Sequence, residues 1–337
     1  MKKPNIAILG ASGLVGQKIL TIMEQEKFPV ATLKLLGNRS VGQTVVFKKK
    51  TYTIEPVTAD SFSGIDIVLA SAGTSVSKKY ASWAVQAGAV FIDNSNAFRM
   101  DKQVPLVLVG VNDTDILTHQ GIIANPNCAT SQLMPVLAPL HQKFGLKKII
   151  VSTYQAVSGA GGKGITELEQ NMAGNITPVV FPHEIAFNVI PQIDDFEENG
   201  YSKEEMKLVR ETKKILHLKN SVKISCTAVR VPVVNGHSEA VTVEFAQEIT
   251  PQQVKNMFKN NPYVTVLDNP VKSIYPTPKK VSGKNPVFIG RIRKDLVFKN
   301  GISFWCVADN LRIGAALNTV RIAQKVLEFN ALKKGIK

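Results

Sequence analysis

Short apolar runs alternate with amphipathic patterns along residues 1–125. The short runs predict strands, and apolar residues spaced three and four apart predict helices. We expect strands at 5–9, 32–36, 66–70, 90–92, 106–109 and 122–124, and helices at 13–26 and 76–87. Strands that alternate with helices are typical of βαβ units, which build a doubly wound parallel sheet.

The pattern changes near residue 147, where the apolar runs become longer and richer in β-branched residues. Runs at 148–155, 222–231, 240–247 and 302–307 predict a mostly antiparallel sheet. A helix is expected at 202–216, after a stretch rich in proline and asparagine at 171–199. A last helix begins near Arg312 and carries one apolar stripe, and its sequence allows it to return to either part of the chain.

A chain of 337 residues exceeds what one hydrophobic core usually supports, so two domains are expected. It has 41 basic and 26 acidic residues, a net charge of +15 that should attract anions. The basic residues form only short scattered runs and aromatic residues are 7%, so we do not expect nucleic-acid binding.

Three cysteines make a poor disulfide framework, so at least one thiol should be free and the compartment reducing. The apolar run at 6–9 is too short for a signal peptide, and no run of 18 apolar residues is present. We therefore expect a cytoplasmic protein that neither spans nor anchors to a membrane.

A glycine-rich loop follows the first expected strand and precedes the first helix: Gly10, Ser12, Gly13, Leu14, Val15 and Gly16 are its chemically important members. Glycines let backbone N–H groups approach a pyrophosphate at a helix N-terminus. The spacing is G-x-x-G-x-x-G rather than G-x-G-x-x-G, and an ordinary strand-to-helix turn is the alternative.

The residues after the second strand bear on which dinucleotide binds. An NAD site usually has an acidic residue there, but this chain has Gly37-Asn38-Arg39-Ser40. Arg39 and Ser40 offer donors suited to a 2′-phosphate, so we expect NADP, unless Arg39 is an ordinary solvated turn residue.

Cys128 follows a predicted strand in Asn125-Pro126-Asn127-Cys128 and opens an apolar helical segment that runs toward His141. A helix N-terminus stabilises a thiolate, which is the nucleophilic form. Pro135 and Pro139 should make this helix kinked or short. Cys226 and Cys306 lie within strand patterns and are expected in the core.

A thiolate that accepts an acyl group also needs an acid and base. His237 lies on a loop beside Gly236, where its imidazole could face a site and titrate near neutral pH. Spacing alone does not choose among the five histidines of the chain.

Five ordered motifs together resemble the aspartate-β-semialdehyde dehydrogenase family, and the likeness covers nearly the whole chain. They lie at 10–16, 93–100, 125–130, 230–238 and 309–319. The family often has cysteine where this chain has Ala228, a packing position.

The resemblance implies an α/β fold: a Rossmann-type NADP-binding domain at 1–127, joined by the helix 312–329, and an α+β catalytic and dimerisation domain with a mostly antiparallel sheet at 128–311. It implies NADPH-dependent, phosphate-releasing conversion of L-aspartyl-4-phosphate to L-aspartate-4-semialdehyde through a cysteine thioester, in lysine, threonine and methionine biosynthesis. The partners implied are these small molecules, inorganic phosphate and further copies in a homodimer or homotetramer, with no metal.

The resemblance also implies roles for individual residues. Cys128 is the nucleophile, His237 the acid and base, and Gln155 positions the acyl intermediate. The substrate and phosphate ligands are Arg99, Asn127, Lys214, Glu211 and Arg230. The cofactor contacts beyond the glycine-rich loop, Arg39 and Ser40 are Ser71, Gly73, Ser158, Gly159 and Asn310.

Without the resemblance these residues have ordinary interpretations. Glu211 and Lys214, three apart on one helix face, would be a surface ion pair of little energy. Arg99 would be a solvated loop residue, Gln155 a polar residue at a strand end, and Asn310 a helix cap.

Other function classes share parts of the pattern. N-acetyl-glutamyl-phosphate reductase and phosphorylating glyceraldehyde-3-phosphate dehydrogenase use the same thiolate, hydride and phosphate chemistry, but Arg230 with Glu211 favours a free amino acid. An NADP-binding protein without catalysis is a further class, against which Cys128, Gln155 and His237 argue.

Overall fold

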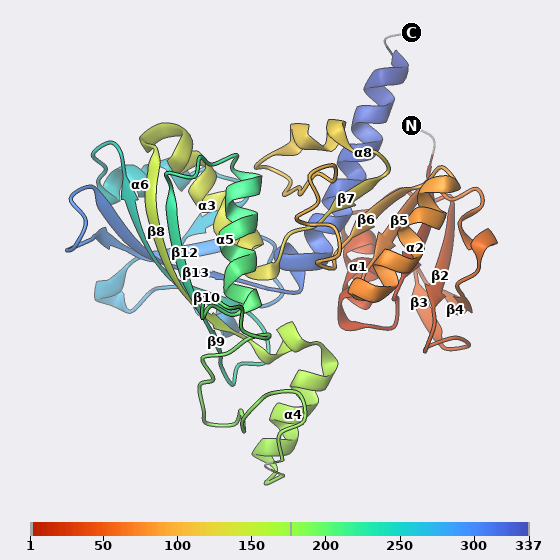
Figure 1. The fold of residues 1–337 in the computed structure, drawn as a ribbon, viewed down its shortest axis with the longest axis horizontal. Coiled ribbons are helices and arrows are strands. Elements are labelled where there is room, and N and C mark those ends of the chain that lie inside the picture. Colours follow the sequence, from red (N-terminus) through yellow and green to blue (C-terminus); the bar gives the residue numbers. More distant parts are fainter. Residues whose placement is uncertain (1–2, 176, 336–337) are drawn as a thin grey trace. The chain divides into compact units, whose positions relative to one another are not determined.

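The computed structural model describes residues 3–175 and 177–335. The chain divides into two compact units (Figure 1). The first unit comprises Met1–Asn127 and Ala315–Lys337, and the second comprises Cys128–Gly314.

The first unit is built on a sheet that, in the described residues, has seven strands in the order β3-β4-β2-β1-β5-β6-β7. Its elements are β1 (Asn5–Leu9), α1 (Leu14–Gln25), β2 (Thr32–Gly37), β3 (Thr44–Phe47), β4 (Lys50–Pro56), β5 (Ile67–Ala70), α2 (Thr74–Gln86), β6 (Val90–Asp93), β7 (Ile122–Ala124) and α8 (Leu317–Gly335). All neighbouring strands are parallel except the β3–β4 hairpin. This is the doubly wound arrangement that the sequence pattern predicts.

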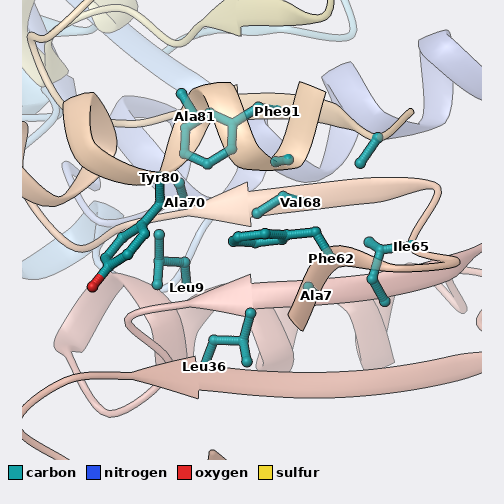
Figure 2. Close-up of a cluster of buried hydrophobic side chains, with 12 residues drawn as sticks. Ala7, Leu9, Leu36, Phe62, Ile65, Val68, Ala70, Tyr80, Ala81 and Phe91 are labelled. Atoms are coloured by element: carbon teal, nitrogen blue, oxygen red, sulfur yellow. The ribbon is translucent and has the colours of Figure 1, made fainter. Parts of the chain in front are cut away.

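The core of the first unit lies on both faces of this sheet. Successive residues of β5 point to opposite faces, and all four are buried. On one face Phe62 and Phe91 pack with Leu9, Val68 and Tyr80, so side chains from β1, β5, β6 and α2 form one cluster (Figure 2).

The segment 106–109 is not a strand, contrary to the expectation from its apolar run. It makes one bridge, between Leu106 and Ala124. Side-chain amides take the place of a neighbouring strand: Asn112 bonds Leu108 N and Leu106 O, while Asn318 bonds Val109 N and Val107 O.

The last helix packs within the first unit. A π-helical turn at Arg312–Ala316 precedes α8, so helical structure begins where the sequence predicts it. Asn318 and Thr319 are fully buried, and Thr319 Oγ1 donates to Asn94 Oδ1 over 2.8 Å.

The second unit has a sheet whose described strands run in the order β11-β12-β13-β10-β8-β9. Its elements are α3 (Cys128–Phe144), β8 (Leu146–Gln155), α4 (Gly162–Met172), α5 (Lys203–Ile215), β9 (Lys223–Arg230), β10 (His237–Phe245), α6 (Pro251–Phe258), β11 (Val264–Val266), α7 (Pro278–Val281), β12 (Val287–Lys294) and β13 (Gly301–Ala308). β8 pairs with β9, and β11 with β12, in parallel; the other pairs are antiparallel, as predicted for most of this sheet.

Helix α3 continues for 17 residues through Pro135 and Pro139, so of the two expectations, a kinked or a short helix, the short one is wrong. Each interior proline costs about 3 kcal/mol through its missing N–H and a steric clash. Residues 129–138 are all buried, and burial of this many side chains offsets that cost.

No helix in the described part of the chain combines the length and the apolar character needed to cross a lipid bilayer.

Candidate active site

Three strands of the second unit bring three predicted site residues into one row. Gln155 is opposite Arg230 in the β8–β9 pairing, and Ser238 is opposite Tyr154 in the β10–β8 pairing, so His237 lies beside Gln155. Gln155, Arg230 and His237 are 1%, 6% and 0% exposed. These polar side chains are thus held on a rigid sheet in a largely desolvated environment.

Cys128 is the first residue of α3 and is partly exposed. Its Sγ lies 3.2 Å from Nε2 of His237. A thiol at a helix N-terminus, in hydrogen-bond contact with an imidazole and open to solvent, has the arrangement of a cysteine nucleophile. Cys226 and Cys306 are buried, as predicted, and none of the three cysteines forms a disulfide.

The second ring nitrogen of His237 is fixed by the backbone. Ala156 N–H donates to Nδ1 over 3.0 Å, and because an N–H can only donate, Nδ1 carries no proton. The neutral ring therefore holds its proton on Nε2, from which it donates to Cys128 Sγ.

Burial, with the nearby charge of Arg230, lowers the pKa of His237 to about 3, while Glu204 acts in the opposite direction. The expectation that this imidazole titrates near neutral pH is therefore wrong in this structure. Desolvation penalises the imidazolium, and protonation of Nδ1 would also break the bond from Ala156.

Gln155 is held from two sides. Its Nε2 donates to Glu204 Oε1 over 3.1 Å, and its Oε1 accepts from Thr153 Oγ1 over 3.0 Å. Glu204 also forms an ion pair with Lys207 at 3.1 Å. Gln155 is thus a fixed, buried amide rather than a polar residue that only ends a strand.

Arg230 and His237 approach the same glycine. Arg230 Nη1 donates to Ala156 O over 2.7 Å. A Cβ at position 159 would lie 2.8 Å from Arg230 Nη1 and 3.2 Å from Cε1 of His237. Gly159 therefore has a steric role in the second unit, since a side chain there would push both groups apart.

A pocket of about 390 Å³ opens beside Arg230. Phe181 packs under the guanidinium, with its ring centroid 5.7 Å from Cζ. Burial lowers the pKa of Arg230, and Glu204 and Cys128 oppose this shift. A buried guanidinium in a pocket of this size suits the carboxylate of a small molecule.

Helix α5 turns a polar face toward the sheet. Glu211 is 1% and Glu204 is 7% exposed, whereas Lys214 is partly exposed. The interpretation of Glu211 as part of a solvated surface pair is therefore wrong, because its carboxyl group is buried.

Asn310 does not cap a helix with its side chain. Its Oδ1 accepts from Gly236 N over 2.8 Å, and its Nδ2 donates to Ser158 Oγ over 3.0 Å. The preceding Asp309 accepts from Leu311 N and Arg312 N instead. Asn310 thus joins the turn before His237 to the segment that carries Ser158.

In the first unit the glycine-rich loop is shaped as a cradle. Gly10 has φ +90°, and a Cβ at Gly16 would collide with Gly10 O. Gly13 precedes α1 and provides no side-chain cap, so the N–H groups of Leu14 and Val15 begin a helix that carries no acidic residue in its first turn. Such an end fits a pyrophosphate.

The cradle lies where strand order reverses, between β1 and β5. Ser71 N donates to Leu9 O over 2.8 Å, and its Oγ reaches Gly10 O at 3.3 Å. Gly73, with φ +89°, precedes α2. Dinucleotides bind at such a switch point in doubly wound sheets, so the predicted cofactor residues Gly10, Ser71 and Gly73 are together at a suitable place.

Arg39 is exposed after β2, and Ser40 is 9% exposed. Arg99 is 7% exposed and donates to the carbonyls of Asn125 (2.9 Å) and Asn94 (2.8 Å), so it is not a solvated loop residue. Asn127 is 6% exposed. These four residues belong to the first unit.

Sequence reasoning missed several residues that shape the site, above all Glu204, Phe181 and Gly314. A Cβ at position 314 would lie 2.7 Å from Cβ of Cys128. The available signal was the spacing of Glu204 and Glu211, seven apart on one helix face. Within the described residues, no group of three histidine, cysteine, aspartate or glutamate side chains is arranged to hold a metal ion.

Two family descriptions match the sequence. Residues 5–119 match the semialdehyde dehydrogenase NAD binding domain, and residues 137–313 match the semialdehyde dehydrogenase dimerisation domain. The first match spans the glycine-rich cradle, and the second spans Gln155, Arg230 and His237.

Relatives of known name align over nearly the whole chain. Aspartate-semialdehyde dehydrogenase of Aquifex aeolicus is 48% identical, with 96% of this chain and 98% of the relative covered. The protein of the same name from Bacillus subtilis is 46% identical, with 97% and 98% covered. The crystal structure of aspartate semialdehyde dehydrogenase II from Vibrio cholerae, complexed with ASA, has a TM-score of 0.94 at 42% identity, with 97% of this chain and 99% of that chain covered. This chain therefore belongs to the aspartate-semialdehyde dehydrogenase family.

Proposed function

We propose that the chain is an NADP-dependent aspartate-semialdehyde dehydrogenase that reduces L-aspartyl-4-phosphate to L-aspartate-4-semialdehyde and releases phosphate. The observation that carries the proposal is the 3.2 Å contact between Cys128 Sγ and His237 Nε2, in the same unit as buried Gln155 and Arg230. The names of the relatives supply the substrate class.

Cys128 is proposed as the nucleophile. Its thiolate accepts a hydrogen bond from Nε2–H of His237 and attacks the acyl carbon of the acyl phosphate. The C–S bond forms, the C–O bond to phosphate breaks, and phosphate leaves with the bonding electron pair. The product is a thioester on Cys128.

When bound, NADPH supplies the hydride that reduces the thioester carbonyl. Nε2–H of His237 then donates to the oxyanion of the thiohemiacetal, as a neutral donor already in place. The oxyanion re-forms a carbonyl, the C–S bond breaks, and Cys128 returns to the thiolate. His237 acts here by donating hydrogen bonds; release of a net proton needs a base to take it, and protonation of Nδ1 needs the Ala156 bond to open.

The residues proposed to bind the substrate are assigned by matching their charges to the charged groups of L-aspartyl-4-phosphate. Arg230 binds the α-carboxylate, Glu211 binds the α-ammonium group, and Arg99 with Lys214 and Asn127 binds phosphate. Gln155, held by Glu204 and Thr153, positions the acyl group. Arg230 with Glu211 favours a free amino acid over an acetylated one or a sugar phosphate.

The first unit is proposed to hold NADP in the cradle Gly10–Gly16, with Ser71 and Gly73 beside it and Arg39 and Ser40 on the 2′-phosphate. Ser158, Gly159 and Asn310 of the second unit are proposed as nicotinamide contacts. The second unit would carry catalysis and dimerisation, in a homodimer or a pair of dimers. Exposed Ile150 and Tyr154 on β8 support a protein contact there. Three reduced cysteines support a cytoplasmic location.

A spectrophotometric assay of NADPH formation tests the proposal. With aspartate semialdehyde and NADP, turnover should require phosphate or its analogue arsenate. N-acetyl-glutamate semialdehyde and glyceraldehyde-3-phosphate should be used at least about a hundredfold less well, since the site lacks matched groups for them. Equal use of an acetylated substrate, or turnover without phosphate, would reject the proposed reaction.

A further inference from the structure

A second pair of side chains, Gln132 on α3 and Glu239 on β10, lies next to Cys128 and His237 on the same faces of these two elements. Gln132 follows Cys128 by four residues on α3 and so shares its helix face. Glu239 follows His237 by two residues on β10 and so shares its face of the sheet. Gln132 and Glu239 are both 0% exposed, and α3 packs against β8, β10 and β13.

The surroundings of Glu239 provide few donors. Its strand neighbours are Thr153 on β8 and Cys306 on β13. Thr153 Oγ1 donates to Gln155, and Cys306 Sγ points to Gln132 O at 3.7 Å. Neither carboxyl oxygen of Glu239, and neither amide atom of Gln132, completes a hydrogen bond of ordinary geometry.

A buried carboxylate without donors is too costly to persist in its charged form. Burial raises the pKa of Glu239 well above its usual range, and the nearby Gln132 amide offsets only part of this. Glu239 interacts electrostatically with Cys226 on β9 and Cys306 on β13, and Cys226 also interacts with Glu204 and Glu205 on α5. The other titratable groups on the neighbouring elements are His237 on its own strand and Cys128 on α3. A negative charge on Glu239 also raises the pKa of the Cys226 and Cys306 thiols, so it would act on a nearby thiolate in the same direction.

A protonated carboxyl and a primary amide each offer one donor and one acceptor on facing edges. The acid O–H of Glu239 suits Gln132 Oε1, and its carbonyl oxygen suits Gln132 Nε2. A carboxylate could still accept from Nε2, but it would leave Oε1 without a donor and facing a negative charge. Both bonds of the pair therefore form only while Glu239 is neutral.

We propose that Glu239 is a protonated positioning residue, which through Gln132 sets the start of α3 against β10 and keeps negative charge away from Cys128. The proposal rests on the proposed function, since that function gives Cys128 its task. Two of its tests use no substrate, so their results stand even if the chain does not turn over aspartate semialdehyde.

The protonation state can be read directly in the unmodified protein. An infrared spectrum at about pH 8 should show the carbonyl stretch of a protonated carboxylic acid, because ordinary carboxyl groups are ionised there. The band should be missing in Glu239→Gln. A wild-type spectrum without this band overturns the proposal.

The charge near Cys128 is tested by iodoacetamide, which should react selectively because the other two thiols are buried. The pH midpoint of Cys128 alkylation should be the same in wild type and Glu239→Gln. A midpoint about one pH unit or more lower in the variant would mean that a charge had been removed, and would overturn the proposal.

Positioning is tested by kinetics. Glu239→Leu should lower kcat about tenfold or more with little change in KM, because a small displacement of the nucleophile costs rate rather than binding. Glu239→Gln should restore most of the loss, since an amide can also pair with Gln132. Wild-type kcat in Glu239→Leu overturns the positioning role; if that variant does not fold, the infrared and alkylation tests still decide.

The matched control is Glu244→Gln on the same strand. Glu244 pairs with Lys148 at 2.9 Å and its side chain is 17% exposed, on the opposite face of β10. This variant should keep both the infrared band and the alkylation midpoint. Loss of the infrared band in Glu244→Gln would show that the protonated carboxyl group belongs to Glu244 and not to Glu239, which would overturn the proposal.

Discussion

The main-chain N–H of Ala156 donates to Nδ1 of His237 over 3.0 Å, which directs the protonated Nε2 toward Cys128 Sγ, 3.2 Å away. The backbone immediately after β8 thus selects the tautomer of the imidazole. A histidine with a pKa near 7 would be partly protonated at neutral pH. His237 instead stays neutral there, because burial and the bond from Ala156 disfavour its protonated form.

This relationship predicts how stability changes with pH. The pKa of His237 is about 3 in the folded protein, against an ordinary value of 6.5. Between these two pH values His237 is therefore protonated in the unfolded chain but not in the folded protein. The contribution of His237 is fully present above pH 6.5 and is lost as pH falls toward about 3. Between about pH 7 and about pH 5, wild type should lose about 1–2 kcal/mol more unfolding free energy than His237→Gln.

Urea unfolding of both proteins at the two pH values gives this difference. Glu239 contributes the opposite slope because its folded pKa is raised, so only the difference between the two proteins is diagnostic. Equal losses in wild type and variant would show that His237 binds its proton normally in the folded state.

Gly314 leaves room for Cys128, and alanine there should displace the nucleophile. The added Cβ would lie 2.7 Å from Cβ and 2.9 Å from Cα of Cys128, closer than atoms tolerate. Gly314→Ala should cost about 1–3 kcal/mol of stability and lower kcat about tenfold or more. Gly162→Ala is the control, since a Cβ there meets nothing within 4 Å; a similar loss in both variants would contradict the steric account.

Asn318 holds the segment 106–109 and should be important for the stability of the first unit. Its amide bonds Val107 O (2.8 Å), Val109 N (2.9 Å) and Asn125 Oδ1 (2.6 Å), all without solvent exposure of its own side chain. Asn318→Ala should lower the unfolding free energy by about 3 kcal/mol or more, because buried partners lose their bonds. The exposed Asn260→Ala should stay within about 0.5 kcal/mol of wild type in the same denaturant titration.

Arg39 is expected to discriminate between the two dinucleotides. Arg39→Ala should raise KM for NADP about tenfold or more and leave KM for NAD nearly unchanged, because only NADP has the 2′-phosphate. Lys27→Ala removes an exposed cation from the same unit and serves as the control for net charge. If Arg39→Ala affects both cofactors equally, Arg39 does not read the phosphate.

The sequence predicts the parallel sheet well because the strand and helix periods are strong there, but it does not reveal the hairpin β3–β4. Lys48 and Lys49 form its turn with φ values of +48° and +62°. Glycine or asparagine usually signals such a turn, whereas two lysines look like a solvated charge run. The two strands are also largely exposed: β3 has only the short apolar run Val45-Val46-Phe47, and β4 has none.

The sequence predicts only part of the site, because the pairing register of the strands determines which side chains meet there. His237 is one of five histidines, and its selection depends on β10 pairing with β8 so that Nδ1 meets Ala156. Glu204 resembles an ordinary acidic residue in the first turn of a helix, and only the packing of α5 brings it to Gln155. Such contacts between distant segments carry no local signal.

The most direct test of the account is a single-turnover experiment on the acyl group at Cys128. With NADP and aspartate semialdehyde but no phosphate, the enzyme should form about one NADPH per active site in a burst and then stop, because the thioester has no acceptor. Mass spectrometry should find the acyl group on the peptide that contains Cys128, and Cys128→Ala should give neither burst nor adduct. A burst in Cys128→Ala, or an acyl group on a different residue, would contradict the central claim.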